Sequence, residues 1–313
     1  MIESFSLRNK QFANRIFVAS GTFGYGDEVT DVVDLARLGG IMTKSLSSKP
    51  RDGNPPPRIA ETASGMLNSI GLANIGVKKF VEEKIPALQN YPCAVIANVA
   101  ASTLEEYCSV VEVLEPHVRV DGFEINVSCP NVKEGGLSFG TDVAKVAQIT
   151  REMRKRTAKP LLVKLTPNVT HISEFARAAE GEGADAVSVI NTLIGMSVNI
   201  RTWKPKLSTV TGGLSGPAIK PVALAKVYEV YKSVKIPVFG IGGISTWEDA
   251  VEFFLVGASA VQVGTANFVS PSSGVSIRDG LVKYCSERSI GDVASLVGAM
   301  KADGNVSVIQ SWL

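Results

Sequence analysis

Eight short apolar segments rich in β-branched residues recur along the chain, and most are followed by a helical pattern. Each segment is continuously apolar rather than alternating, which is typical of parallel strands covered on both faces. Strand–helix alternation repeated eight times predicts a (β/α)8 TIM barrel of the α/β class, and an open doubly wound sheet is the alternative. The predicted strands are Ile16–Ser20, Ile41–Ser45, Ala94–Val99, Gly122–Val127, Leu161–Leu165, Ala186–Ile190, Val238–Ile241 and Ala260–Val263.

Helical patterns separate these segments, and two of them begin at recognisable caps. Ser102-Thr103 precedes two glutamates, and Ser245-Thr246 precedes Glu248-Asp249, which is the residue order of a capped helix start. Residues 1–313 are predicted to form one barrel domain, with 301–313 as a C-terminal tail. The clearest predicted helices are Leu104–Leu114, Asp142–Thr157, Ile172–Glu182, Ala223–Ser233 and Trp247–Leu255.

The composition allows a large core and argues against several classes of function. Of the 313 residues, 45% are hydrophobic and 20% charged, and the net charge is +2. Without a basic block, nucleic-acid binding has little support, and no apolar run approaches the ~20 residues of a membrane span. The first residues lack the apolar stretch of a signal peptide, and no two of the four cysteines form a C-x-x-C pair that would suggest a metal site. We therefore expect a soluble cytoplasmic protein that holds no metal.

Two connections are longer than ordinary strand-to-helix loops. One runs from Leu46 to a predicted helix at Gly76–Leu88, and the other runs from Thr192 to Pro221. Both follow the carboxyl ends of predicted strands, where barrel enzymes build their active sites. We expect these segments to form a lid over a ligand. Surface elaboration is the alternative, which accounts for their prolines but not for their clustered asparagines and glycines.

Polar and glycine residues follow the predicted strands at the points where they end. Because the carboxyl ends of barrel strands meet at one mouth, we expect these residues to share one site. Each taken singly would more often be a structural turn residue, but three asparagines, two lysines and a thiol together favour a binding site. In strand order they are Ser20, Lys44-Ser45, Asn98, Asn126 with Cys129, Lys164, Asn191-Thr192, Gly242-Gly243 and Gly264-Thr265.

The thiol belongs to the segment that begins at Asn126 and reads Asn-Val-Ser-Cys-Pro-Asn-Val-Lys-Glu-Gly-Gly. Cys129 precedes a proline that stops sheet pairing and two glycines that permit the loop to bend. This order predicts a reactive residue on a movable loop above a rigid sheet.

Glycines at the ends of the last two strands predict a phosphate site. In Gly240-Ile-Gly-Gly243 and Val263-Gly-Thr265, glycine permits close backbone approach, and backbone amides can hold an anion. Either motif alone is weak because glycine also makes tight turns, but the two motifs together are a stronger signal.

Lysines and asparagines at the mouth predict the kind of ligand. Lys164 interrupts an apolar strand, and a buried lysine is costly without a partner, so we expect it to face a ligand group that becomes negative. The alternative is a lysine that extends to solvent at the rim. Amides that both donate and accept hydrogen bonds suit a small, flat, polar heterocycle, whose carboxylate Lys44 could meet. The amides are those of Asn68, Asn98, Asn126 and Asn191.

These residues together resemble the class 1 dihydroorotate dehydrogenases, most closely the catalytic subunit of class 1B. The resemblance spans nearly the whole chain, in order, and its motifs are jointly specific. The matching segments are Thr43–Ser45, Gly53–Arg58, Asn68–Leu72, Ile96–Asn98, Asn126–Asn131, Val163–Leu165, Ile190–Thr192, Gly212–Pro217, Gly240–Gly243 and Val263–Thr265.

The resemblance implies a barrel that holds one FMN and oxidises (S)-dihydroorotate to orotate in pyrimidine biosynthesis. Cys129 would be the base that removes the C5 proton, while the C6 hydride passes to the flavin and Lys164 stabilises the reduced flavin. The implied FMN-binding residues are Ser20, Lys44, Ser45, Asn98, Asn126, Lys164, Ile190, Gly216, Gly242, Gly243, Gly264 and Thr265. The implied substrate-binding residues are Lys44, Asn68, Ser69, Ile70, Gly71, Leu72, Asn126, Asn191 and Thr192.

The same resemblance implies a partner. Class 1B enzymes pair this subunit with an iron–sulfur flavoprotein that carries FAD and a [2Fe–2S] cluster and passes electrons to NAD+, around a homodimer core within a heterotetramer. Four alternatives remain. Two are related enzymes: a fumarate-dependent class 1A type and a dihydropyrimidine oxidoreductase. The others are a flavin-free phosphate-binding lyase or synthase with a Schiff base at Lys164, and a non-catalytic scaffold.

Overall fold

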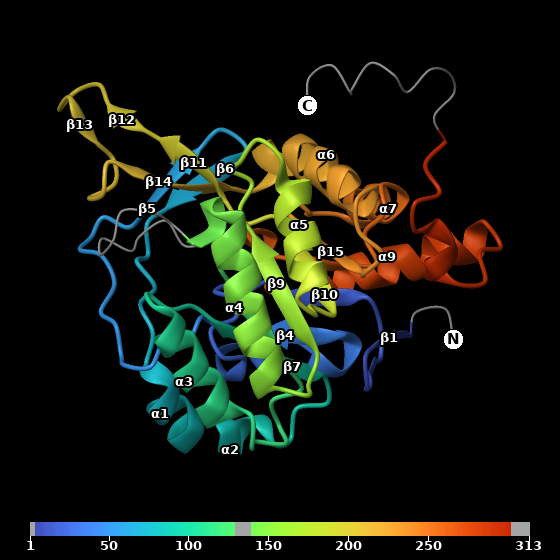
Figure 1. Ribbon diagram of the computed structural model, residues 1–313. Helices are drawn as coiled ribbons and strands as arrows, with labels where there is room; N and C mark the ends of the chain where they lie inside the picture. Colours follow the sequence, from blue (N-terminus) through green and yellow to red (C-terminus); the bar gives the residue numbers. More distant parts are fainter. Residues whose placement is uncertain (1–3, 129–138, 302–313) are drawn as a thin grey trace.

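Eight parallel strands close into a barrel in the computed structural model, which describes residues 4–128 and 139–301 (Figure 1). The last strand of the barrel pairs with the first, so the predicted (β/α)8 barrel is confirmed and the open sheet is wrong. Each barrel strand is buried along its whole length, which accounts for the continuous apolar segments of the sequence. In barrel order the strands are β3 (Ile16–Val18), β4 (Gly40–Met42), β7 (Ala94–Val99), β8 (Gly122–Asn126), β9 (Leu161–Leu165), β10 (Ala186–Val189), β15 (Val238–Ile241) and β16 (Ala260–Val263).

Helices surround the barrel and pack their apolar faces on it. The predicted caps are confirmed, because Thr103 accepts a hydrogen bond from the Glu106 amide and Thr246 forms a capping box with Asp249. The helices are α1 (Gly76–Lys79), α2 (Ile85–Leu88), α3 (Leu104–Leu114), α4 (Val143–Arg156), α5 (Ile172–Gly181), α6 (Lys220–Tyr231), α7 (Trp247–Leu255), α8 (Ala266–Val269) and α9 (Ser273–Glu287). A π-helical turn, η3 (Phe80–Lys84), joins α1 to α2, and short 3-10 turns are η1 (Asp27–Val29), η2 (Leu35–Arg37), η4 (Phe139–Thr141), η5 (Pro217–Ile219) and η6 (Val293–Leu296).

An N-terminal hairpin packs at the end of the barrel opposite its mouth. It consists of β1 (Phe5–Leu7) and β2 (Lys10–Phe12), and it shares a buried cluster with residues at the amino ends of the barrel strands. The Phe12 and Phe239 rings lie within 6 Å of the Phe5 ring, with centroids at 5.9 and 5.7 Å respectively. The barrel is therefore packed shut at this end, and ligand access falls to the carboxyl ends of the strands.

The two long connections are not loops. They supply the four strands of one antiparallel sheet, in the order β11-β14-β6-β5, which extends from the barrel beside a smaller hairpin (Figure 1, upper left). The expected lid is thus a paired sheet that walls the mouth of the barrel. Its pairing joins segments far apart in the sequence, so local patterns did not indicate it. The strands are β5 (Ile59–Thr62), β6 (Gly65–Asn68), β11 (Leu193–Met196) and β14 (Thr211–Ser215), and the hairpin is β12 (Val198–Asn199) with β13 (Lys204–Pro205).

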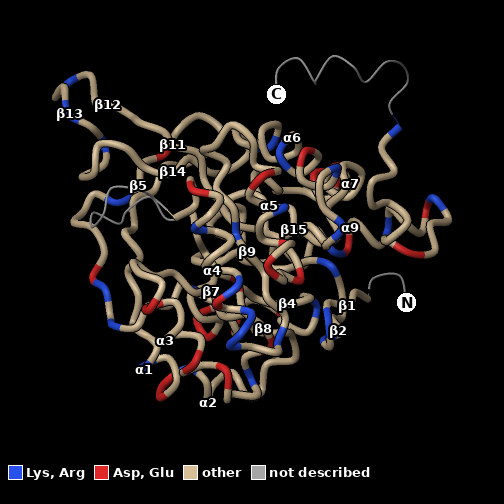
Figure 2. The backbone as a smooth tube through the Cα atoms, viewed as in Figure 1, with Lys and Arg blue, Asp and Glu red and all other residues tan. Residues whose placement is uncertain are grey.

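Basic and acidic residues are interspersed along the tube rather than gathered on one element (Figure 2).

In the described part of the chain, no helix combines the length and the apolar character needed to cross a bilayer. Of the predicted tail at 301–313, all but Lys301 lies outside the described residues.

Candidate active site

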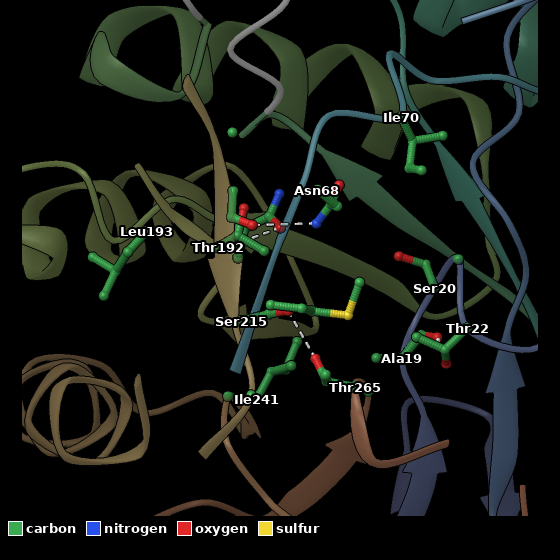
Figure 3. Close-up of a pocket in the computed structure, with 18 of the residues that line it drawn as sticks. Ala19, Ser20, Thr22, Asn68, Ile70, Thr192, Leu193, Ser215, Ile241 and Thr265 are labelled. Carbon is green, nitrogen blue, oxygen red and sulfur yellow. Dashed lines mark hydrogen bonds between the residues drawn. The ribbon is translucent and has the colours of Figure 1, made fainter. Parts of the chain in front are cut away.

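A cavity of about 540 Å³ opens at the carboxyl ends of the barrel strands and is bounded on one side by the antiparallel sheet. Its volume lies in the range of ~300–1,000 Å³ that is typical of small-molecule and cofactor sites. Figure 3 shows Ser20 and Thr265 from the barrel facing the same space as Asn68 and Thr192 from the two excursions. The barrel and the sheet therefore build one site.

Nearly all of the residues predicted from the sequence meet in this cavity. Asn98 does not line it, because its side chain is fully buried. Cys129 lies outside the described residues, and the preceding Ser128 lines the cavity. The predicted residues that line it are Ser20, Lys44, Ser45, Asn68, Ser69, Ile70, Gly71, Leu72, Asn126, Lys164, Ile190, Asn191, Thr192, Gly216, Gly242, Gly243, Gly264 and Thr265.

The cavity carries positive charge that no lining acid offsets. Lys44 and Lys164 both line it, and no aspartate or glutamate does so among the described residues. Lys164 is only 5% exposed, so the alternative of a lysine extended to solvent is wrong. Its Nζ lies 3.3 Å from Ser20 Oγ and 3.9 Å from Glu124 Oε2. Such a cavity suits an anionic ligand.

Gly243, Gly264 and Thr265, which follow the ends of β15 and β16 where the sequence predicts a phosphate site, line the cavity. Among the described residues, none accepts a hydrogen bond from the backbone N–H groups of Gly243, Gly264 or Thr265. Apart from the neighbours of Gly264 in the chain, Ala19 Cβ, at 3.5 Å, is the only atom of the described residues within 4 Å of a Cβ added at this glycine. Thr265 Oγ1 donates to Ser215 Oγ at 2.8 Å, which ties the end of β16 to β14 (Figure 3). Unpaired donors at two neighbouring strand ends favour a phosphate or carboxylate there.

Amides and hydroxyls that line the cavity form a connected chain of hydrogen bonds. Asn191 Nδ2 donates to Ser128 Oγ at 2.6 Å, and Ser128 Oγ donates to Asn126 Oδ1 at 2.7 Å. Ser69 lines the cavity, and its buried Oγ has no hydrogen-bond partner among residues 4–128 and 139–301. A ligand that both donates and accepts hydrogen bonds fits this part of the cavity.

Inspection of the sequence did not single out three polar residues at or below this site. Ser215 lines the cavity, as does Asn168, whose Nδ2 donates to Thr192 O at 3.0 Å and whose Oδ1 accepts from the Ile194 amide at 3.0 Å. Asn168 follows the end of β9, so the expectation that polar residues after strand ends share one site could have included it. Glu124 lies inside β8, is fully buried, and interrupts an apolar strand as Lys164 does, which was the available signal.

Comparison with known proteins decides the family. The family model for dihydroorotate dehydrogenase matches residues 3–284. The chain belongs to the dihydroorotate dehydrogenase family. Relatives include proteins named "dihydroorotate dehydrogenase B (NAD(+)), catalytic subunit" from Geotalea uraniireducens, 52% identical over 92% of this chain and 94% of the relative, and from Trichlorobacter lovleyi, 50% identical over 95% and 98%. A protein of the same name from Bacteroides thetaiotaomicron is 47% identical over 95% and 98%.

Membership of the dihydroorotate dehydrogenase family is incompatible with a non-catalytic scaffold and disfavours the flavin-free lyase. It also agrees with the cavity, whose lysines and amides were expected for a flat heterocycle with a carboxylate. No cluster of three or more histidine, cysteine, aspartate or glutamate side chains suited to a metal ion occurs within residues 4–128 and 139–301.

Proposed function

We propose that this chain is the FMN-containing catalytic subunit of an NAD+-linked dihydroorotate dehydrogenase, which oxidises (S)-dihydroorotate to orotate. The observation that carries this proposal is the cavity at the barrel mouth. It combines a cradle of unpaired amides with two lysines, and it has no lining carboxylate among the described residues. The names of relatives with 47–52% identity support the same reaction.

The residues of the cavity fit FMN. Gly242, Gly243, Gly264 and Thr265 would hold the phosphate, since backbone N–H groups without partners among the described residues lie at this end of the cavity and only Ala19 Cβ lies within 4 Å of a Cβ added at Gly264. Apolar side chains that line the cavity, among them those of Ala19, Ile190 and Ile241, suit a flat aromatic ring. When bound there, FMN supplies the acceptor for the two electrons and the hydrogen that leave C6 of the substrate.

The chain itself binds the substrate and handles its proton. Lys44 pairs with the carboxylate of dihydroorotate, and the amides of Asn68, Asn126 and Asn191 hydrogen-bond its ring carbonyl and N–H groups. Cys129, which follows cavity-lining Ser128 directly in the chain, takes the C5 proton as general base. Lys164 presents its ammonium to the negative charge that develops during the reaction.

The decisive experiment is anaerobic reduction of the purified protein. We expect a yellow protein that releases FMN on heating and loses its flavin absorbance when dihydroorotate is added. Dihydrouracil, which lacks the carboxylate, serves as the matched control and should leave the absorbance unchanged. A colourless protein, or a flavin that dihydroorotate does not bleach, contradicts the proposal.

Transfer of electrons onward is part of the same proposal. We propose that they reach NAD+ through a cytoplasmic iron–sulfur flavoprotein partner carrying FAD and a [2Fe–2S] cluster, bound to a homodimer of this chain in a heterotetramer. Co-purification from the native host tests this, with NAD+ and fumarate compared as oxidants. Turnover with fumarate by the isolated chain would point instead to the class 1A type.

A further inference from the structure

The carboxylate of Glu124 lies inside the barrel, next to the cavity residue Lys164. Glu124 is on β8, its exposed fraction is 0%, and its polar contacts come from four other barrel strands. Since a buried charge is costly unless it is paired and hydrogen-bonded, such a residue requires a reason to be there. The mechanism proposed above does not use it.

The contacts of Glu124 divide between its two oxygens. Oε1 accepts from Ser188 Oγ and from Gln262 Nε2, both at 2.7 Å. Oε2 accepts from Asn98 Nδ2 at 2.6 Å and lies 3.9 Å from Lys164 Nζ. Every partner is a donor or a cation, which is the set that an ionised carboxylate accepts. Oε2 therefore faces the cavity side of the network, and Oε1 faces residues that do not line the cavity.

Two cavity residues depend on Oε2. Because Asn98 Nδ2 is engaged by Glu124, its Oδ1 is left to accept from Ser45 Oγ at 2.6 Å, and Ser45 lines the cavity. Lys164 has no other ion-pair partner in the part of the chain that the structure describes. Glu124 thus orients the Ser45–Asn98 pair and offsets one of the two positive charges of the cavity.

We propose that Glu124 is a positioning residue that holds the Lys164 ammonium at the floor of the cavity and sets how much positive charge the flavin experiences. This inference rests on the proposed function, since it concerns FMN bound in that cavity. Loss of the carboxylate leaves the Lys164 charge uncompensated. Reduced flavin carries more negative charge than oxidised flavin, so its formation becomes easier and the reduction potential rises.

The test compares the midpoint potential of FMN in three holoproteins at pH 6.5. Glu124→Gln should raise the potential by about 30 mV or more, which is a tenfold change in the equilibrium constant of a two-electron couple. Ser188→Ala is the matched control, because it removes one hydrogen bond to Oε1 but keeps the carboxylate and the Lys164 contact. In Ser188→Ala, the equilibrium constant of flavin reduction should differ less than twofold from that of the wild type. A Glu124→Gln shift below twofold, a fall in potential, or an equal shift in Ser188→Ala overturns the inference.

A second comparison asks whether Glu124 acts through Lys164. In a Lys164→Gln background, Glu124→Gln should shift the potential by a smaller amount than in the protein that keeps Lys164, and a shift of equal size overturns the inference. If that background does not retain flavin, fluorescence titration of the apoprotein with FMN replaces the potential. Glu124→Gln should then change the FMN dissociation constant less when Lys164 is already replaced than when it is present, and an equal change contradicts the proposed coupling.

Two other outcomes can be told apart from failure of the Glu124 inference: a variant that does not fold, and a wild-type protein that lacks the proposed function. If Glu124→Gln does not fold, Glu124→Asp is used instead, because it keeps the charge on a shorter side chain. Its melting temperature should fall, but the equilibrium constant of flavin reduction should differ less than twofold from that of the wild type. A tenfold shift in Glu124→Asp overturns the inference. A wild-type protein that binds no flavin refutes the proposed function, whereas a flavin-binding wild type with an unshifted Glu124→Gln variant refutes only the role of Glu124.

Discussion

Asn68 and Gly213 are 145 residues apart in the chain, yet they are direct partners in the antiparallel register of β6 and β14, where Asn68 Nδ2 donates to Gly213 O at 3.4 Å. This pair joins the two excursions that leave the mouth of the barrel after its second and sixth strands. It fixes the position of Asn68, which lines the cavity, relative to Thr192 on the opposite excursion (Figure 3). The substrate side of the site thus depends on a contact between distant parts of the chain.

Gly213 is required by this packing. A Cβ added at Gly213 would lie 2.2 Å from Thr192 Oγ1 and 2.7 Å from Thr192 Cβ, so Thr192 would have to move. We expect Gly213→Ala to lower the free energy of unfolding by about 1–3 kcal/mol, as overpacked sites do, and to weaken orotate binding. Urea denaturation and calorimetric titration with orotate measure the two effects.

Gly181→Ala is the control for that substitution. Gly181 lies in α5 and has nothing within 4 Å of its Cβ position, so alanine there should leave orotate binding unchanged and add about 0.5–1 kcal/mol to the free energy of unfolding. Normal orotate affinity in Gly213→Ala would show that the pairing of the two excursions does not position Thr192.

Lys44 is expected to anchor the carboxylate of the substrate, because it lines the cavity and forms no ion pair with any described residue. A hydrogen bond to a charged group contributes about 1.5–3 kcal/mol, so Lys44→Ala should raise the dissociation constant of orotate roughly 10- to 100-fold. Lys78→Ala, at a side chain that is 86% exposed, is the control and should bind orotate normally. Quenching of flavin fluorescence by orotate provides the measurement, and equal affinities for the two variants would remove Lys44 from this role.

The barrel was predictable because its signals are local. Each of the eight predicted strands overlaps an observed one, and α3 and α7 have the predicted ends. Closure of a parallel barrel then brings strand ends together without further information, so residues such as Ser20, Lys164 and Thr265 could be assigned to one mouth from the sequence alone.

The remaining features depend on pairing between distant segments. The β5–β6 and β11–β14 hairpins were interpreted as loops, because β11 and β14 are rich in glycine and half exposed and carry no clear alternation of polar and apolar residues. Asn98 was expected at the ligand because it ends a strand, but its side chain turns into the barrel toward Glu124. Such a choice depends on a partner on a neighbouring strand, which strand-by-strand inspection does not reveal.

Asp249 links a helix cap to the loop of the predicted phosphate site, and its effect should depend on pH. Burial alone raises the pKa of Asp249, but hydrogen bonds from Lys220 and from the Ser245 and Thr246 amides outweigh it, so the pKa lies below the ordinary value of 3.8. A carboxyl group whose pKa is lower in the folded than in the unfolded protein stabilises above the unfolded value and loses this effect as pH falls through the folded value. We expect Asp249→Asn to lower the free energy of unfolding by about 1 kcal/mol near pH 6.5.

Urea denaturation at several pH values checks this expectation. The difference between wild type and Asp249→Asn should shrink as pH falls below 3.8. Glu252→Gln is the control, because Glu252 also contacts Lys220, at 2.9 Å, but caps no helix and is 46% exposed. Glu252→Gln should lower the free energy of unfolding much less than Asp249→Asn does at every pH. A constant difference between wild type and Asp249→Asn would show that the charge of Asp249 does not contribute.

Cysteine reactivity separates the proposed base from a structural thiol. Burial raises the pKa of Cys93 to about 11, so at pH 8 very little of it is thiolate and iodoacetamide should label it only after unfolding in urea. Cys129, as the proposed base, should be labelled in the native protein with parallel loss of dihydroorotate oxidation, and orotate should slow the labelling. Peptide mass spectrometry measures both sites in one sample.

Cys129→Ala should keep its FMN and lose nearly all turnover near neutral pH, and unchanged turnover in that variant would remove Cys129 from the mechanism.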